Sequence, residues 1–300
     1  MLNNQVDLSF CIKEKIRETK LEDLKIGGDS SLSFMKENNN VSKPLIAIEL
    51  PYNQDFAYPE ILKNIWNTKN VDETLEKALK SKADLVSIKF NLQETSFDEE
   101  LEAVKSFLQQ LKSKQITKPL ILRGMNNSEF DKKLIPILAQ YAPKECIIAF
   151  GEEDTYEQIV TSVIENNHIL VLRTPIDINI AKELNILTSD KGLSADRILI
   201  DPDMGGLGYG LDYGYSIIEK IRAAAFDGDT MLNMPIIAFI GEESYRAKEA
   251  KSDTFGNQWG SYKERAAMWE ISGASAMISA GANIVVLWNP QSVETLKGLV

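Results

Sequence analysis

The segment DPDMGGLGYGLDYGY, residues 201–215, combines acids, glycines and tyrosines in one short loop. Glycine backbone can approach a phosphate closely, so dinucleotide or nucleoside triphosphate binding is the first hypothesis. The spacing argues against both. Gly206, Gly208 and Gly210 follow G-x-G-x-G rather than the dinucleotide pattern, and Leu211-Asp212 stand where a P-loop has Lys and Ser or Thr. Two acids nearby would also repel a phosphate.

Polar side chains also end nearly every short apolar run of the chain. Lys89 offers Schiff-base chemistry or an ion pair with Glu49 or Asp201, and Glu49 with Asp201 offers the carboxylate pair of a glycosidase. No single pair is specific, because so many runs end in a charge. The strand-end residues are Glu49, Lys89, Arg123 with Asn126, Glu152 with Asp154, Arg173 with Asp177, Asp201 with Asp203, Glu242 with Glu243, and Asn289.

Metal and nucleophile chemistry lacks the usual residues. The chain has two cysteines, Cys11 and Cys146, and one histidine, His168. These are too few for a disulfide framework or for a self-contained iron–sulfur or Cys/His metal site. His168 opens an apolar run, which favours a strand residue over a partner in Ser-His or Cys-His catalysis.

The overall charge and the N-terminus restrict the partners. The 300 residues include 33 Lys plus Arg and 44 Asp plus Glu, a formal net charge of -11. This charge disfavours nucleic acid and anionic membranes as partners. The first twenty residues lack a signal-peptide pattern, and no apolar run approaches the roughly 20 residues of a membrane span. We therefore expect a cytoplasmic protein.

Eight short apolar runs rich in Val and Ile recur along the chain. Near-continuous hydrophobicity of this kind is typical of strands in a parallel sheet that is covered by helices. The runs are IAIEL from residue 46, LVSIKF from 85, PLILRG from 119, CIIAFG from 146, HILVLRT from 168, RILIDPD from 197, PIIAFIG from 235 and NIVVLWNP from 283.

Helical patterns lie between the runs. Residues 96–114 carry one apolar face, and Ser96 with Glu99 predicts a capping box; Ser128 with Asp131 predicts another. Further helices are predicted in 71–82, 153–166, 177–187, 213–226, 264–281 and 291–300. Eight alternations predict an α/β fold, a (β/α)8 TIM barrel over residues 45–300, preceded by an N-terminal extension, residues 1–44, with one amphipathic stretch.

Function in this fold collects at the C-terminal ends of the strands, which form the barrel mouth. The 201–215 loop follows the sixth strand. It is either a turn whose acids cap the next helix and pair with Arg173 or Arg197, or a surface that contacts a large flat ligand. For the second case the candidate ligand-binding residues are Asp201, Asp203, Gly205, Gly206, Gly208, Tyr209 and Gly210.

This loop also carries a resemblance. DPDMGGLGYGLDYGYSIIEKIRAAAFDGDTMLNMPII, with TPIDINIAKELNILTSDKGLSADRILI before it and ERAAMWE and AGANIVVLWNP after it, resembles the small (delta) subunit of the corrinoid iron–sulfur protein, part of the acetyl-CoA decarbonylase/synthase complex. IGGDSSLSFMKENNNVSKPLIAIEL is similar to that family's entry into its first strand. The resemblance covers about residues 26–291 in order.

The resemblance implies a (β/α)8 barrel related to pterin-dependent methyltransferases. It implies a heterodimer with a large corrinoid iron–sulfur subunit that carries a 4Fe-4S cluster, with a corrinoid (cobamide) enclosed between the two chains. The complex would take a methyl group from methyltetrahydrofolate, through a methyltransferase, and pass it to acetyl-CoA synthase in the reductive acetyl-CoA (Wood–Ljungdahl) pathway. Transient contacts with these two enzymes and with a reductive activator follow. The small subunit itself would be non-catalytic.

Two enzymatic alternatives stay open. The related methyltransferases hold pterin with Asp and Asn at strand ends, and Asn126 and Asp177 stand at comparable places, so the chain could be a pterin:corrinoid methyltransferase acting through Asn126, Asp177 and Asp201. The same two residues can instead cap the helices that follow them. An unrelated barrel lyase would use Lys89.

Overall fold

The computed structural model describes residues 13–31, 41–53, 58–203 and 210–300. Eight parallel strands form one sheet in the order β8-β7-β6-β5-β4-β3-β10-β9, and a parallel bridge between Ile200 and Ile236 joins its two ends. All eight predicted strands are confirmed, and so is the barrel. The strands are β3 (Leu45–Pro51), β4 (Leu85–Lys89), β5 (Leu120–Arg123), β6 (Ile147–Gly151), β7 (Ile169–Arg173), β8 (Ile198–Asp201), β9 (Ile237–Phe239) and β10 (Ile284–Leu287).

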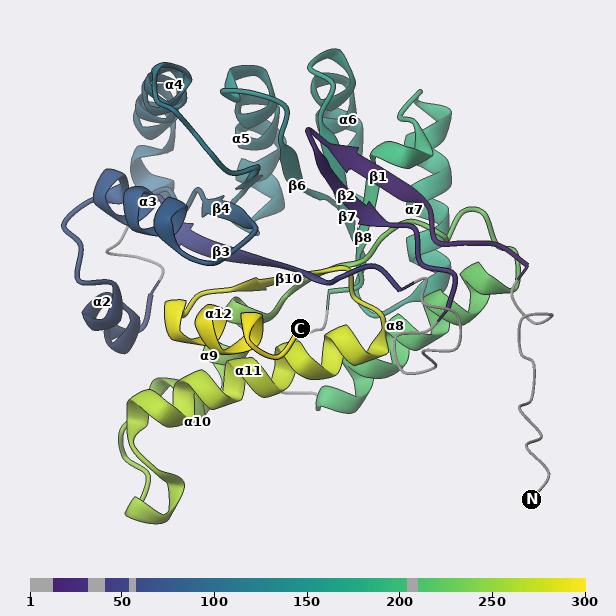
Figure 1. Cartoon of the computed structure of the whole chain (residues 1–300). Helices are drawn as coiled ribbons and strands as arrows, with labels where there is room; N and C mark the ends of the chain where they lie inside the picture. Colours follow the sequence, from purple (N-terminus) through teal and green to yellow (C-terminus); the bar gives the residue numbers. More distant parts are fainter. Residues whose placement is uncertain (1–12, 32–40, 54–57, 204–209) are drawn as a thin grey trace, which may run out of the picture.

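Helices surround the barrel (Figure 1). They are α2 (Glu60–Trp66), α3 (Val71–Lys80), α4 (Phe97–Ser113), α5 (Ser128–Tyr141), α6 (Tyr156–Glu165), α7 (Ile178–Asp190), α8 (Leu211–Phe226), α9 (Ile240–Arg246), α10 (Lys248–Lys251), α11 (Tyr262–Ala280) and α12 (Pro290–Lys297). Short 3-10 turns are η2 (Glu94–Ser96), η3 (Ala195–Arg197) and η5 (Asn257–Trp259). In the part of the chain that the structure describes, no helix combines the length and the apolar character needed to cross a membrane.

Both predicted capping boxes are wrong in detail. The hydroxyl of Ser96 donates to Glu100 at 3.2 Å and makes no capping bond to α4. Asn127, one residue before the predicted Ser128, caps α5 by accepting from the Glu129 N–H at 3.2 Å. Ser96 is still the N-cap residue of α4, but its side chain bonds Glu100 instead of the helix backbone. The cap of α5 moved because a one-residue shift in the helix start is enough to exchange neighbouring polar side chains at the N-cap.

Side chains along the strands alternate between two environments, as a two-residue side-chain period requires, except at the irregularity of β6, where Ala149 and Phe150 both belong to the core inside the barrel. On β5, Leu120 and Leu122 pack against the surrounding helices. Ile121 belongs to the core inside the barrel, and Arg123 is the next residue of the strand with the same inward direction. Every inward position near the N-terminal strand ends is apolar, and this core includes Leu45, Ala47, Leu85, Ile121, Ile147, Ile169, Leu199, Ile237 and Ile284.

An antiparallel hairpin closes the N-terminal end of this core. It consists of β1 (Glu18–Leu21) and β2 (Leu24–Gly27), and Leu21 and Ile26 are buried in the same cluster as the barrel interior. The sequence analysis expected only an amphipathic stretch in this extension. The hairpin covers this end, and two pockets open at the opposite end, among the C-terminal strand ends, which form the mouth.

Candidate functional site

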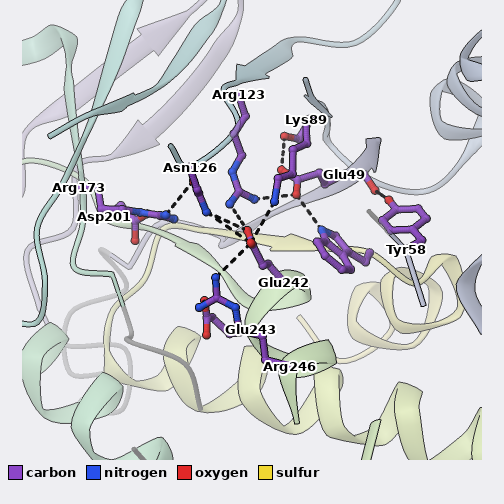
Figure 2. Close-up of polar contacts among 12 residues, drawn as sticks. Glu49, Tyr58, Lys89, Arg123, Asn126, Arg173, Asp201, Glu242, Glu243 and Arg246 are labelled. Carbon is purple, nitrogen blue, oxygen red and sulfur yellow. Dashed lines mark hydrogen bonds and ion pairs between the residues drawn. The ribbon is translucent and has the colours of Figure 1, made fainter. Parts of the chain in front are cut away.

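A single carboxylate, that of Glu242, lies at the centre of the mouth (Figure 2). It accepts from Lys89 Nζ at 3.0 Å and from Arg246 at 3.2 Å, and it forms an ion pair with Arg123. Glu242 lies in the first turn of α9, which follows β9 directly. A Cβ at Gly241 would lie 2.6 Å from the Trp288 ring, so glycine allows α9 to sit this deep in the mouth.

Arg123 is the fully buried member of this network. Its guanidinium donates to Glu49 Oε1 at 2.8 Å, and it lies 4.9 Å from the ring centre of Phe150 and 4.7 Å from that of Phe239. Burial alone would lower the pKa of Arg123, but the carboxylates of Glu242 and Glu49 have the larger opposite effect, so the pKa is raised overall. Arg123 is therefore a permanent cation inside the barrel.

Glu49 is held from several sides. Ser87 Oγ donates to its Oε2 and Trp288 Nε1 donates to its Oε1, both at 2.8 Å. The hydroxyl of Tyr58 donates to its backbone carbonyl. The indole of Trp288 also stacks on Tyr245 with ring centres 5.9 Å apart. Sequence reasoning listed Glu49 but missed these aromatic partners, although Trp288 follows β10 directly and that position was a usable signal.

The second ion pair of the mouth joins Arg173 and Asp201. Both Nε and an NH2 group of Arg173 lie 2.8 Å from Asp201 Oδ2, and the guanidinium lies 3.4 Å from the ring centre of Phe150. Burial raises the pKa of Asp201, and Arg173 counters that rise. The acid of the 201–215 loop thus pairs with Arg173, one of its two predicted partners, whereas Arg197 pairs with Glu145.

Asn126 connects the two ion pairs. Its side-chain oxygen accepts from Arg173 at 3.2 Å, and its amide nitrogen lies 3.4 Å from both oxygens of Glu242. The predicted capping role is wrong, since Asn127 caps α5. Asn126 adopts a left-handed backbone with φ of +66°, which turns its side chain toward the barrel axis.

Asp177 lies outside this network. Its carboxylate accepts from the N–H groups of Asn179 at 2.7 Å and Ile180 at 3.2 Å, so it is the N-cap of α7, as one of the two alternatives predicted. The structure therefore brings Asn126 and Asp201 together and leaves Asp177 in a local role.

The remaining candidates of the 201–215 loop divide by position. Gly205, Gly206, Gly208 and Tyr209 lie outside the described residues. The backbone N–H of Asp203 donates to Asp201 Oδ1 at 3.1 Å. Gly210 precedes α8 with φ of +105°, a backbone conformation that favours glycine at the start of this helix.

The predicted partners of Lys89 were wrong. Lys89 pairs with Glu242 rather than with Glu49 or Asp201. In the β3–β4 register Glu49 faces Ser87, so Lys89 lies one inward position closer to the mouth opening and reaches the level of α9. Such a difference depends on strand register and on the placement of α9, which one sequence does not give.

The network is balanced in charge. Four basic side chains, Lys89, Arg123, Arg173 and Arg246, face four acids, Glu49, Asp201, Glu242 and Glu243. Burial would raise the pKa of Glu242, but the charges of Arg123, Lys89 and Arg173 hold it well below its usual range. Burial and the charge of Arg123 lower the pKa of Lys89.

Glu243 is the exception within this set. Burial raises its pKa to about 7, which the ion pair with Arg246 at 2.8 Å only partly offsets. Its Oε2 is buried and has no hydrogen-bond partner among the described residues. An orphaned carboxyl oxygen of this kind can bond to a ligand, as an acceptor when ionised and as a donor when protonated.

Two open pockets flank the network. Each has a volume of about 510 Å³. One is lined by Tyr58, Pro59, Lys89, Asn91, Leu92, Met125, Glu242, Tyr245, Arg246 and Trp288. The other is lined by Glu152, Glu153, Asp154, Arg173, Pro175, Ile180 and Asp203. Both offer hydrogen-bonding groups over a wide, shallow area, which suits a large ligand with many polar substituents.

The described residues contain no group of three or more His, Cys, Asp or Glu side chains placed to hold a metal ion. His168 lies just before β7, at the end of the barrel opposite the mouth. Its Nδ1 accepts from the Cys146 N–H at 3.1 Å, and its Nε2 lies 2.8 Å from the Ala139 carbonyl. His168 is therefore a structural residue, as its place in an apolar run predicted.

Comparisons with known proteins add to this geometry. A family model described as CO dehydrogenase/acetyl-CoA synthase delta subunit matches residues 17–295. The chain belongs to this family. It is 28% identical over 294 residues to acetyl-CoA decarbonylase/synthase complex subunit delta 1 of Methanosarcina thermophila, which covers 91% of this chain and 64% of that protein. The match to subunit delta of Methanopyrus kandleri is 28% identical over 71% of this chain and 52% of that protein.

This delta-family chain thus spans about half to two thirds of the length of these relatives. Among solved structures it is similar to Yersinia pestis dihydropteroate synthase, with a TM-score of 0.60 and 14% identity over 94% of this chain and 97% of that one. Xanthomonas albilineans dihydropteroate synthase in complex with 7,8-dihydropteroate matches with a TM-score of 0.57 and 15% identity over 86% and 93%. At this identity the likeness shows the barrel fold alone.

Proposed function

We propose that this chain is the small subunit of a corrinoid iron–sulfur methyl carrier, which encloses a cobamide together with a large subunit that holds the 4Fe-4S cluster. In this proposal the complex receives a methyl group from methyltetrahydrofolate through a methyltransferase. It then delivers the group to acetyl-CoA synthase, and a reductive activator returns oxidised cobalt to its reduced state. Membership of the delta family and the resemblance of the 201–215 loop support the proposal.

One observation supports the proposal that this subunit has no catalytic role. Except for Glu243, whose Oε2 has no hydrogen-bond partner among the described residues, the ionisable side chains of this network, from Glu49 to Arg246, bond to one another with their charges balanced. A catalytic base or nucleophile needs a free, correctly poised group within reach of substrate. A neutral, mutually bonded layer instead forms a rigid surface beneath a bound molecule.

The mouth also suits a surface that lies against one face of a corrinoid. A cobamide supplies the cobalt that carries the methyl group, and its rim bears amide groups that accept and donate hydrogen bonds. Glu243 Oε2, Asn91 and Arg246 would meet such amides from this chain. Since His168 lies at the other end of the barrel, no histidine of this chain would ligate the cobalt. The chain contributes contact area and excludes water.

The alternative, a pterin:corrinoid methyltransferase, would act through Asn126, Asp177 and Asp201. Asp177 is occupied as a helix cap, and Oδ2 of Asp201 is occupied by the ion pair with Arg173. A pterin that displaced Arg173 would leave an uncompensated buried charge, which costs about 3–5 kcal/mol. The geometry therefore favours the carrier role.

The test is to mix this chain with the large corrinoid iron–sulfur subunit and a cobamide, and to follow cobalt content and the corrinoid absorption spectrum across a size-exclusion profile. The proposal predicts a one-to-one complex that holds cobalt, whereas the chain alone retains none. A chain that neither pairs nor takes part in cobalt retention would refute it.

A calorimetric titration of the isolated chain with a methyl-tetrahydropterin distinguishes the carrier proposal from the methyltransferase alternative. The carrier proposal predicts no saturable binding. Saturable binding that disappears in Asn126→Ala would instead favour the methyltransferase, because Asn126 is the amide that the related enzymes would use.

A further inference from the structure

An apolar groove lies between α8 and α11, outside the mouth network. It has a volume of about 590 Å³ and is lined by Leu211, Trp259, Gly260, Glu264, Arg265, Met268, Trp269, Ser272 and Gly273. Three of its large apolar side chains are strongly exposed: Leu211 at 39%, Trp259 at 48% and Met268 at 57%. Tyr213, on the first turn of α8, is exposed at 56%. Large apolar groups gathered in one place mark interaction surfaces.

The wall that carries Trp259 is held in place by a buried arginine. Arg265 donates to the carbonyls of Glu249 at 2.8 Å, Gly260 at 3.1 Å and Ser252 at 2.7 Å. Its guanidinium lies 4.9 Å from the ring centre of Phe255, whose ring lies 5.4 Å from that of Trp259. Arg265 thus fixes the segment between α10 and α11, which projects from the barrel in Figure 1. A large indole is presented to solvent in a fixed position, which lowers the entropic cost of binding.

The groove opens at the same end of the barrel as the mouth. Leu211 begins α8, which follows the loop after β8, and Trp259 and Arg265 flank the start of α11. Helices of this fold start at the C-terminal ends of the strands. A protein seated in the groove would therefore stand beside the mouth.

The negative net charge of the chain bears on which protein could bind in the groove. A second copy would carry the same formal net charge of -11 over the whole chain, and this like charge opposes self-association. The groove itself adds the exposed carboxylate of Glu264, which accepts from Ser261 at 2.7 Å. A partner with apolar side chains and a neutral or basic rim complements these features.

We propose that the α8–α11 groove is the docking surface for the large corrinoid subunit, with Trp259 and Met268 as its main contacts. The inference rests on the proposed function, because that function supplies the heterodimer. It goes further by placing the partner on the side of the mouth next to the 201–215 loop.

The test compares two variants with two matched controls in calorimetric binding to the purified large subunit. Trp259→Ser and Met268→Ser remove groove contacts. Ile164→Ser on α6 and Ile186→Ser on α7 remove apolar side chains that are 38% and 37% exposed from other faces. We expect each groove variant to bind at least about tenfold more weakly, as central aromatic and methionine contacts do, and each control to bind within about twofold of wild type. Thermal melting of all four variants checks that each is folded at the temperature of the binding measurement, since part of each side chain is buried.

The outcomes separate the inference from the proposed function. If wild type pairs and the groove variants pair equally well, the groove is not the docking surface, while the carrier proposal stands. If wild type does not pair at all, both fail. If light scattering shows that the chain dimerises alone and that Trp259→Ser abolishes the dimer, a second copy occupies the groove and the inference is overturned.

Discussion

The two halves of the barrel interior use the same strands for opposite purposes. Toward the N-terminal strand ends the inward residues are apolar and are sealed by the β1–β2 hairpin. Toward the mouth the next inward position is charged on several of these strands: Ile121 is followed by Arg123 on β5, and Val171 is followed by Arg173 on β7. On β5 and β7, therefore, a step of two residues along the strand separates the apolar core from the buried ion network.

The two halves of the interior stabilise the fold under different conditions. Apolar burial stabilises without requiring a particular partner, whereas each buried charge requires compensation at a defined position. The polar layer is therefore the half that depends on exact placement, and it is the half beneath the proposed ligand. A rigid, neutral layer suits a protein that covers a reactive cofactor rather than one that reacts with it.

Arg123→Met should produce the largest effect. It leaves the buried carboxylates of Glu49 and Glu242 without their shared cation, so the free energy of unfolding should fall by about 3–5 kcal/mol. Urea unfolding at neutral pH measures this loss. A loss below about 1 kcal/mol would mean that the charges are solvated, and the contrast between the two halves would disappear.

Glu270→Gln should change the pH dependence of stability. Glu270 is fully buried on α11 and accepts from the Trp288 N–H at 2.6 Å, and burial raises its pKa to about 7. Folding therefore takes up a proton between about pH 4.5 and pH 7, so this group makes stability fall as pH rises through that window. The variant should gain on the order of 1–3 kcal/mol relative to wild type between pH 5 and pH 8.

The control for that experiment is Glu129→Gln, an exposed acid on α5. Its unfolding free energy should follow the wild-type curve at both pH values. A Glu270→Gln curve parallel to wild type would show that Glu270 binds no extra proton in the folded state.

Ile121→Val probes the apolar half of the same strand. Because it removes one methyl group from a fully buried site, it should cost about 1 kcal/mol, several times less than the change at Arg123 two residues away. Urea unfolding of both variants under one condition gives the ratio directly. Equal losses would show that the two layers do not differ in kind.

Asp177→Ala should have the smallest effect. Loss of the α7 N-cap should lower stability by about 0.5–1 kcal/mol. Cobamide loading of the complex should stay unchanged, because the carboxylate faces the helix backbone. Lost loading with intact stability would restore Asp177 as a ligand-binding residue.

Much of the fold could be predicted from the sequence. The eight apolar runs and the helical patterns between them are long-range regularities, and the residues at the strand ends necessarily meet at the mouth. The hairpin was missed because ETKL and LKIG are only four residues each and carry Lys and Glu on their exposed positions. Short edge strands have little periodic signal.

The pairings within the mouth could not be predicted for a different reason. Which charges meet depends on register and on the depth of α9, as the Lys89–Glu242 pair illustrates. Asn127 rather than Asn126 caps α5, and Asn126 has a left-handed backbone that the sequence does not indicate. The central role of Glu242 could only be suspected, since the sequence places it among many strand-end acids.

Asn126→Gly tests the central claim, that the mouth covers the cofactor and supplies no catalytic group. Glycine accepts the positive φ of this position and removes only the amide that joins Arg173 to Glu242. The measurement is the rate at which the cobalt-loaded complex accepts a methyl group from methyltetrahydrofolate and the methyltransferase. The account predicts a rate within about twofold of wild type. A loss of about 100-fold or more with cobamide loading intact, the size expected for removal of a catalytic group, would contradict it.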